Sequence, residues 1–261
     1  WSYGLSVGAH ADIHALEYIP GSSTDVLIGC DGGVFKGKTN GVPGAFLSDG
    51  MQIGQVYRFG NYAPDANLMI TGYQDNGISY LKGNQWFFST TGDGMESFFD
   101  YTDPRYQYSS TQRGALIRKI QDSLMWAPIT SGITESAWWL VPFQMDPVNP
   151  QILYTGFTNV WKSTDRGNNW TKISNYSGNF LSDIAVAPSN PNYIYFTRWN
   201  GGINSVYKTT DGGTNWANIT GTLPYLTGAP KDIAVHPSDP EKIWVVYSSS
   251  TASTKVFQSN D

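Results

Sequence analysis

The sequence is poor in cysteine, in charge and in long apolar runs, and each shortage excludes a class of protein. A single cysteine, Cys30, among 261 residues allows no internal disulfide, although a chain of this length can bury its own core. Charged residues make up 14%, about half the usual share, which excludes a coiled coil and a charge-rich disordered chain. No stretch approaches the eighteen or so consecutive apolar residues of a membrane-spanning helix.

The balance of charge excludes two kinds of partner. The chain carries 16 Lys and Arg against 21 Asp and Glu, a formal net charge of −5. Nucleic acid and anionic membrane surfaces attract basic proteins, so neither is expected to bind here. Trp1 is followed by neither a basic nor a long apolar segment, so no signal peptide is expected within the sequence. What the chain has in quantity is aromatic residues, at 15%, and turn formers, with 28 Gly and 14 Pro.

A repeat of 40 to 50 residues runs through the chain. Segments 181–195 and 230–244 share the core Asp-Ile-Ala-Val-x-Pro-Ser-x-Pro and lie 49 residues apart. Two weaker copies precede them, so the second prolines of the pattern fall at positions 104, 150, 191 and 240. Two further segments extend the series to the N-terminus, and six units begin in the chain. Self-similarity at this period indicates a repeat architecture.

Each unit is predicted to contain four short strands. In the fifth unit, apolar runs separated by turn residues predict strands at 182–186, 193–197, 205–209 and 216–219. No stretch keeps helical i, i+3, i+4, i+7 spacing for three turns, which argues against a helical solenoid. Four strands per 40 to 50 residues are typical of a β-propeller blade. The sequence therefore predicts one all-β propeller segment over 1–261, part of a ring of seven or more blades. Its six blades are placed at about 12–55, 56–94, 95–140, 141–181, 182–230 and 231–261, the last incomplete.

A second motif, Ser/Thr-x-Asp-x-Gly-x-x-Trp, occurs twice, 46 residues apart. We expect its aspartate to accept backbone N–H bonds in the turn between the third and fourth strands, and its glycine to adopt a positive φ. The tryptophan is expected to pack under the hairpin. These residues are thus predicted to be structural. They are Ser163, Asp165, Gly167 and Trp170 in one copy, and Thr209, Asp211, Gly213 and Trp216 in the other.

These motifs resemble the Asp-box of bacterial-neuraminidase-type (BNR) repeats. Together with segments 10–16, 29–35, 72–77 and 92–95, they make the chain similar to the sortilin-like and xyloglucanase-like propellers. Many such propellers occur in exported surface proteins of Bacteroidetes that use the type IX secretion system. The resemblance therefore implies a protein that is secreted or held on the outer cell surface of a Gram-negative bacterium. Members of the superfamily differ in function, so the fold by itself assigns none.

One face of the predicted propeller collects polar and aromatic side chains. The loops from strand two to strand three, and from strand four to the next blade, share that face. Flat rings that stack on sugars and polar groups that bind hydroxyls are typical of a carbohydrate site. The predicted ligand-binding residues are His10, Asp12, His14, Gln74, Asn76, Arg113, Trp138, Trp139, Arg198 and Trp199.

Three aspartates on that face, Asp31, Asp75 and Asp93, are candidates for catalysis. Glycoside hydrolysis needs two carboxylates several ångströms apart, one acting as acid and the other as base or nucleophile. The segment Asp-Gly-Gly-Val-Phe at Asp31 resembles the Asp-x-Gly-Gly segment that carries the base in xyloglucanases, with one residue fewer. In that family the acid comes from a second propeller, which this sequence does not contain. The alternative, which we favour, is that Asp31 and Asp75 cap strand turns.

Two other kinds of site are considered from the sequence, a metal site and a sialidase active site. His10, Asp12 and His14 alternate along a strand and could form a metal trio, but hydrogen-bonded structural side chains are favoured. No metal or cofactor is therefore predicted. A sialidase would need an arginine cluster and a Tyr–Glu pair, and Arg166 lies in an Asp-box on the opposite face.

The function favoured by the sequence is a non-catalytic recognition or adhesion module that binds a glycan or a surface or secretion-machinery protein. The alternative is a xyloglucanase-like glycoside hydrolase with a two-carboxylate mechanism. One modification is also predicted, because 122–124 reads Asp-Ser-Leu, the acceptor pattern for O-glycosylation of exported Bacteroidetes proteins, with Ser123 as the acceptor.

Overall fold

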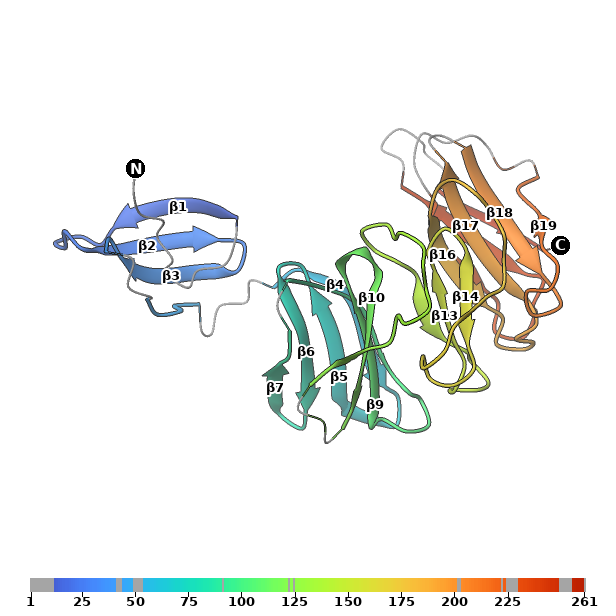
Figure 1. Cartoon of the computed structure of the whole chain (residues 1–261), viewed down its shortest axis with the longest axis horizontal. Helices are drawn as coiled ribbons and strands as arrows, with labels where there is room; N and C mark the ends of the chain where they lie inside the picture. Colours follow the sequence, from blue (N-terminus) through green and yellow to red (C-terminus); the bar gives the residue numbers. More distant parts are fainter. Residues whose placement is uncertain are drawn as a thin grey trace.

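The computed structural model describes residues 12–40, 44–48, 54–90, 92–121, 123, 125–200, 203–221, 223, 230–248 and 255–260. Apart from one short 3₁₀ turn at Gln112–Gly114, every regular element in these ranges is a β-strand (Figure 1). The all-β fold expected from the repeats is therefore confirmed. Among the described residues, no helix has the length and apolarity needed to cross a membrane.

The strands form antiparallel blades that follow one another along the chain (Figure 1). The second and third blades join in one eight-stranded sheet, because β6 and β8 pair in parallel at Asn76 and Gly92. The first blade has β1 (Ile13–Tyr18), β2 (Asp25–Cys30) and β3 (Gly33–Lys38). The second has β4 (Val56–Tyr62), β5 (Asp65–Tyr73), β6 (Asn76–Lys82) and β7 (Gln85–Phe88). The third has β8 (Gly92–Phe99), β9 (Tyr106–Thr111), β10 (Ala115–Ile120) and β11 (Ala127–Pro128).

The last three blades are separate sheets. In the fifth blade the second strand runs three residues past its predicted end, because the hairpin register continues to the pair Asn200 and Ile203. The fourth blade has β12 (Phe143–Met145), β13 (Leu153–Gly156), β14 (Val160–Ser163) and β15 (Thr171–Lys172). The fifth has β16 (Leu181–Val186), β17 (Ile194–Asn200), β18 (Ile203–Thr209) and β19 (Ala217–Asn218). In the sixth, the described strands are β20 (Pro230–Val235), β21 (Ile243–Tyr247) and β22 (Val256–Ser259).

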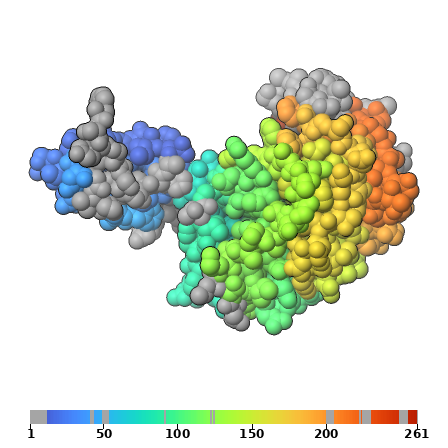
Figure 2. Space-filling view, in the orientation of Figure 1, coloured from blue at the N-terminus to red at the C-terminus, as the bar shows by residue number. Residues whose placement is uncertain are grey.

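The hydrophobic core lies between neighbouring blades. Successive residues of a strand point to opposite faces of its sheet, yet Leu153 and Tyr154 are both 0% exposed. Blade four is therefore covered on both faces, and Figure 2 shows the blades from the second onward as adjacent bands of colour. Aromatic rings fill the space between blades three and four, with the Phe98 and Phe143 centroids 4.9 Å apart. This stacking explains why the chain is rich in aromatic residues.

The motif turn between β14 and β15 is a closed hydrogen-bond network. The Ser163 hydroxyl accepts the N–H of Gly167 at 2.8 Å, and the Asp165 carboxylate accepts the N–H of Asn169 at 2.8 Å. Burial raises the pKa of Asp165, but the bonds from Asn169 and Ser163 outweigh it, and the net pKa is lowered. The indole N–H of Trp170 donates to a main-chain carbonyl of the third blade. The turn therefore fastens its blade to the preceding one.

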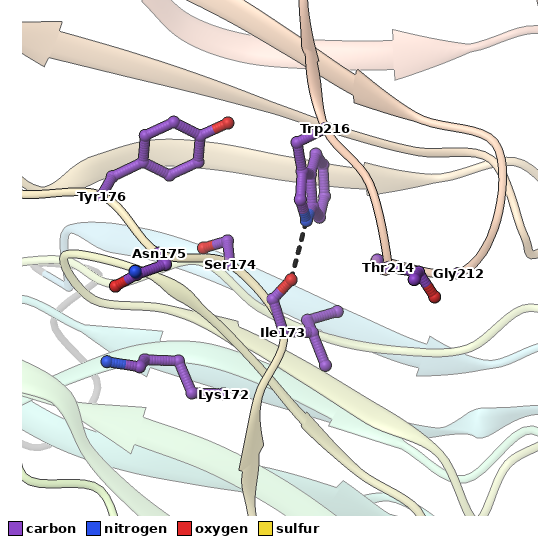
Figure 3. Close-up of a pocket in the computed structure, with 9 residues that line it drawn as sticks. Lys172, Ile173, Ser174, Asn175, Tyr176, Gly212, Thr214 and Trp216 are labelled. Carbon is purple, nitrogen blue, oxygen red and sulfur yellow. Dashed lines mark hydrogen bonds between the residues drawn. The ribbon is translucent and has the colours of Figure 1, made fainter.

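The second motif turn, in the fifth blade, repeats these contacts. Asp211 accepts the N–H of Asn215 at 2.9 Å, and Gly213 adopts a φ of 103°. The Asn215 N–H lowers the pKa of Asp211 to about 2. Figure 3 shows the indole N–H of Trp216 directed at the carbonyl of Ile173 in the fourth blade, 2.7 Å away. The same turn sequence thus produces the same link between blades at two places.

A β-bulge interrupts the inner strand of five of the six described blades. In β4, β16 and β20 the residue that resumes pairing after the bulge is Arg58, Asp183 and Asp232, respectively. Bulges redirect side chains and are frequent next to functional sites. Here these three residues line one cavity of about 300 Å³, together with Glu96 of β8. The bulges therefore bring charged residues of four blades together.

Candidate functional site

Three carboxylates from the first two blades form a cluster. Asp12 precedes β1, Asp31 follows β2, and Asp75 lies between β5 and β6. One carboxylate oxygen of each lies within 4.8 Å of the others. Asp12 and Asp75 have positive φ values of 55° and 61°, a conformation that aspartate tolerates in tight turns. An oxygen-only set of this kind could hold Ca²⁺ or Mg²⁺.

The Asp31 carboxylate faces a histidine of its own blade. His14 Nε2 is in hydrogen-bond contact with Asp31 Oδ1, and the carboxylate must be the acceptor. The Asp31 side chain is 33% exposed, so it is held in place and still open to a ligand. Asn76 Nδ2, from the second blade, donates to the Asp31 carbonyl at 3.5 Å. The two blades therefore meet at Asp31.

The loop that carries Asp75 is held from below by Asp93 of β8. The Asp93 Oδ1 atom accepts the Asp75 N–H at 2.6 Å, and Asp93 is itself only 5% exposed. A Cβ atom at Gly77 would stand 1.9 Å from the carbonyl oxygen of Thr90, so this close approach requires glycine. Gln74 accepts the N–H of Asn76 through its carbonyl at 2.7 Å. Asp93 is thus placed to position the loop.

An aromatic groove lies on the later blades. Its volume is about 710 Å³. Trp138 and Trp199 line the groove, and these residues are 53% and 38% exposed, respectively. The Trp138 ring centroid lies 5.8 Å from that of Phe180. Trp138 comes from the loop between blades three and four, and Trp199 from the β17–β18 hairpin. Two predicted ligand-binding tryptophans therefore share one groove.

Two further predicted ligand residues, Arg113 and Arg198, donate hydrogen bonds to main-chain carbonyls. Arg113 has a φ of 61°, and its N–H donates to the carbonyl of Trp139 at 2.9 Å. Arg198 is 7% exposed, and its Nη2 donates to the carbonyls of Ser177 and Asn179 at 2.9 Å. Arg198 therefore supports the groove wall rather than lining the groove. His10 lies outside the described residues.

The cavity at the bulges was missed by sequence reasoning. Arg58 Nε donates to Glu96 at 2.9 Å, and the Asp183 carboxylate accepts the N–H of Ile233 in the next blade at 2.8 Å. Burial raises the pKa of Glu96 and, more strongly, that of Asp183. Asp183 and Asp232 were visible in the sequence as the repeated Asp-Ile-Ala-Val core. Because both residues belong to that repeat, they were interpreted as part of the blade pattern and not as candidates for a functional site.

The chain is similar to a sortilin family model and to a xyloglucanase. Residues 158–261 match the family model described as Sortilin, neurotensin receptor 3. A xyloglucanase from Hypocrea jecorina (strain QM6a) is 30% identical over 172 residues, covering 56% of this chain and 20% of the relative. The chain therefore spans about a fifth of the length of the curated relative that it matches.

Solved structures support the fold. An ancestral GH74 enzyme matches 98% of this chain and 37% of its own chain, with a TM-score of 0.65 at 18% identity. The GH74 enzyme of Niastella koreensis matches 92% of this chain and 41% of its own, with a TM-score of 0.59 at 19% identity. The predicted β-propeller segment, similar to the sortilin and xyloglucanase propellers, is confirmed at the level of fold.

The prediction of a non-catalytic recognition or adhesion module is wrong. The curated relative is a xyloglucanase, and the solved structures with the same fold include GH74 enzymes. From the sequence, Asp31 was favoured as the cap of its own turn. Among the described residues, its carboxylate instead contacts His14 and lies beside those of Asp12 and Asp75.

Proposed function

We propose that this chain is a propeller portion of a glycoside hydrolase that cleaves a polysaccharide, and that Asp31 supplies one of the two catalytic carboxylates. The observation that carries the proposal is the Asp31 site itself: a half-open carboxylate, bonded to His14, in a cluster of three acids. The xyloglucanase relative makes a xyloglucan-type β-glucan the first substrate to test.

In this proposal Asp31 acts as general base or nucleophile. Its Oδ1 accepts the His14 N–H, which orients the carboxylate, while its carbonyl accepts the Asn76 amide. The other carboxylate oxygen can accept a proton from water or attack the sugar. Asp93, being buried and bonded to the Asp75 N–H, is proposed as a positioning residue.

The second catalytic carboxylate is proposed to come from another part of the protein. The oxygens of Asp12, Asp31 and Asp75 approach within 4.8 Å of one another. Carboxyl groups that flank a scissile glycosidic bond lie about 5 to 5.5 Å apart in retaining enzymes and roughly 6.5 to 9.5 Å apart in inverting ones. The spacing in the cluster is shorter than the inverting separation, so a sugar and an attacking water would not fit between two of its members.

The aromatic groove supports the same function. Exposed Trp138 and Trp199 rings provide stacking surfaces of the kind that bind sugars. We further propose that the motif turns are Asp-box repeats and that the protein works outside the cell. A Gram-negative outer surface, type IX export and a secretion-machinery partner remain predictions from the sequence resemblance.

The test is release of new reducing ends from xyloglucan, mixed-linkage β-glucan and xylan by the protein that carries this chain. Asp31→Asn keeps the shape of the side chain but removes its basicity, so turnover should fall by about 10² to 10⁴ while sugar affinity is retained. Asp65→Asn, in the β4–β5 hairpin, is the matched control and should stay active. Absence of hydrolysis by the unmodified protein, or full activity of Asp31→Asn, would overturn the proposal.

A further inference from the structure

We infer that the aromatic groove selects polysaccharides that carry uronic acid carboxylates. This inference rests on the proposed function, because it names the class of polysaccharide that the hydrolase holds. The groove contains two cationic side chains, Arg58 and Lys231, next to its sugar-stacking rings. No Asp or Glu is among the described residues that line it, although the whole chain has a net charge of −5. The lining residues are Arg58, Trp138, Leu140, Asn179, Phe180, Leu181, Ser182, Trp199, Pro230, Lys231 and Ser248.

Cationic and acidic side chains of this region line two different spaces. Lys231 and Asp232 are consecutive residues of β20, at its bulge. Lys231 lines the groove, whereas Asp232 lines the neighbouring 300 Å³ cavity with Glu96 and Asp183. The bulge interrupts the regular alternation of side chains at this point, and the two neighbouring residues line different spaces. The charged residues among the described lining of the groove are therefore both cations, Lys231 and an Arg58 that is also paired with Glu96 of the neighbouring cavity.

Arg58 is the one residue that lines both spaces among those described. Its Nε donates to Glu96 at 2.9 Å and its Nη1 donates to the Tyr57 carbonyl at 3.0 Å, which fixes the guanidinium. The side chain remains 45% exposed, and Nη2 has no hydrogen-bond partner among the described residues. A fixed, half-exposed guanidinium with an open donor is suited to a carboxylate acceptor.

The chemistry of the ligand follows from combining these features. A pyranose ring can stack on Trp138 or Trp199, and a carboxylate on that ring can accept charge-assisted hydrogen bonds from Arg58 and Lys231. A neutral glucan would offer only hydroxyls to the two cations. Because both cations reach solvent, the attraction should weaken as salt screens it.

The experiment compares binding of three soluble β-1,4-glucan oligosaccharides of equal length: neutral, oxidised at C6 to glucuronic acid, and sulfated at C6. Binding is measured by calorimetry at low and high salt, in the Asp31→Asn background so that hydrolysis does not interfere. We expect the oxidised form to bind about tenfold or more tightly than the neutral form at low salt. The preference should shrink at high salt.

Variants separate charge from stacking. Lys231→Gln should abolish most of the preference for the oxidised form and leave neutral binding unchanged, whereas Trp138→Ala should weaken binding of both. Arg58→Lys should keep part of the preference, and Lys82→Gln, an exposed charge on β6, is the control that should change nothing.

Equal affinity for oxidised and neutral forms, or a preference that survives Lys231→Gln, would overturn the inference. Equal binding of the sulfated and oxidised forms would overturn the assignment to carboxylates. Each of these outcomes concerns binding and is independent of reducing-end release, so the groove can fail while the hydrolase proposal stands. Conversely, a charge-selective groove in a protein without hydrolytic activity would retire the proposed function alone.

Discussion

The carboxylate of Asp183 accepts the backbone N–H of Ile233 across 2.8 Å and so ties the inner strands of blades five and six together. Burial raises the pKa of Asp183 well above its usual value, and the nearby Asp232 and Glu96 raise it further, against the opposing effect of the Ile233 bond. Arg58 is the cation that faces the same cavity. One carboxyl group therefore both links two blades and resists ionisation.

A raised pKa in the folded state has a definite consequence for stability. The folded protein prefers the protonated Asp183, so its stabilising contribution is full below the unfolded pKa of about 3.8 and is lost as pH rises through the folded pKa. Asp183→Asn keeps an oxygen acceptor for the Ile233 N–H and removes the charge. We expect this variant to have a higher Tm than the unmodified protein at pH 7 and a flatter pH dependence above about pH 4. Thermal melts across that range check this, with Asp239→Asn on an exposed turn as control, and a lower Tm at pH 7 would contradict it.

The motif turns make a second prediction, on stability alone. In Ser163→Ala the N–H groups of Gly167 and Asp165 lose their common acceptor within a buried turn. The free energy of unfolding should fall by roughly 1 to 3 kcal/mol, measured by chemical denaturation. Ser189→Ala, an exposed turn serine, should have little effect. Loss of sugar binding or hydrolysis without loss of stability would show that the turn serves the ligand instead.

Arg166 supports a third prediction, on the contact between blades three and four. Its guanidinium pairs with the fully buried carboxylate of Asp100 and lies 4.0 Å from the ring centroid of Tyr106. Arg166→Gln should lower the free energy of unfolding by about 3 to 5 kcal/mol, because it leaves a buried charge without its cation. Arg105→Gln, which breaks an exposed ion pair with Asp103, should cost about 1 kcal/mol or less.

A double variant tests whether the stability lost in Arg166→Gln comes from the unpaired charge of Asp100. The double variant Arg166→Gln with Asp100→Asn removes both partners and should recover part of the lost stability. A double variant as unstable as the sum of the two single variants would contradict the pairing.

A fourth prediction concerns the loop beneath the acidic cluster and rests on the proposed hydrolysis. Asp93→Ala removes the acceptor of the Asp75 N–H and should lower turnover about tenfold or more, because the loop that carries Asp75 and Asn76 loses its support. Asp93→Asn keeps an acceptor and should restore most of the activity. Equal loss in both variants would mean that the Asp93 charge takes part directly.

The fifth prediction is a covalent modification. Ser123 is exposed, and its hydroxyl donates to the carbonyl of Met125 at 2.8 Å, so it is accessible to a glycosylating enzyme. Its sequence neighbours in the acceptor pattern lie outside the described residues. Native protein should show an added glycan mass on the Ser123 peptide, absent in Ser123→Ala. An unmodified peptide from the native source would contradict the prediction.

The blade pattern was predictable because it depends on neighbours in sequence. Alternating apolar residues and turn formers specify short strands, and the Ser163 and Thr209 motifs close their turns with contacts over four residues. The motif tryptophans were expected to pack under their hairpins. Their bonds to carbonyls of the preceding blade, such as that of Trp216 to Ile173, were not foreseen because they join residues 43 positions apart.

The composition of the sites could be predicted only in part. Asp31, Asp75, Trp138 and Trp199 were chosen because the predicted propeller puts their loops on one face. The sequence did not indicate that His14 would contact Asp31, since a strand bulge at His14 sets that direction. Arg58 and Lys231 were overlooked because each is an ordinary cation in an inner strand.

The sequence by itself determined an all-β chain of repeated four-stranded blades with structural turns, because strand and turn formation rest on contacts within a few tens of residues. Tertiary structure alone decided which side chains meet. The acidic cluster joins loops of two blades, and the aromatic groove joins Arg58 of blade two with Lys231 of blade six. The physical reason is that bulges and the stacking of blades set these approaches, and neither depends on residues adjacent in sequence to the side chains concerned.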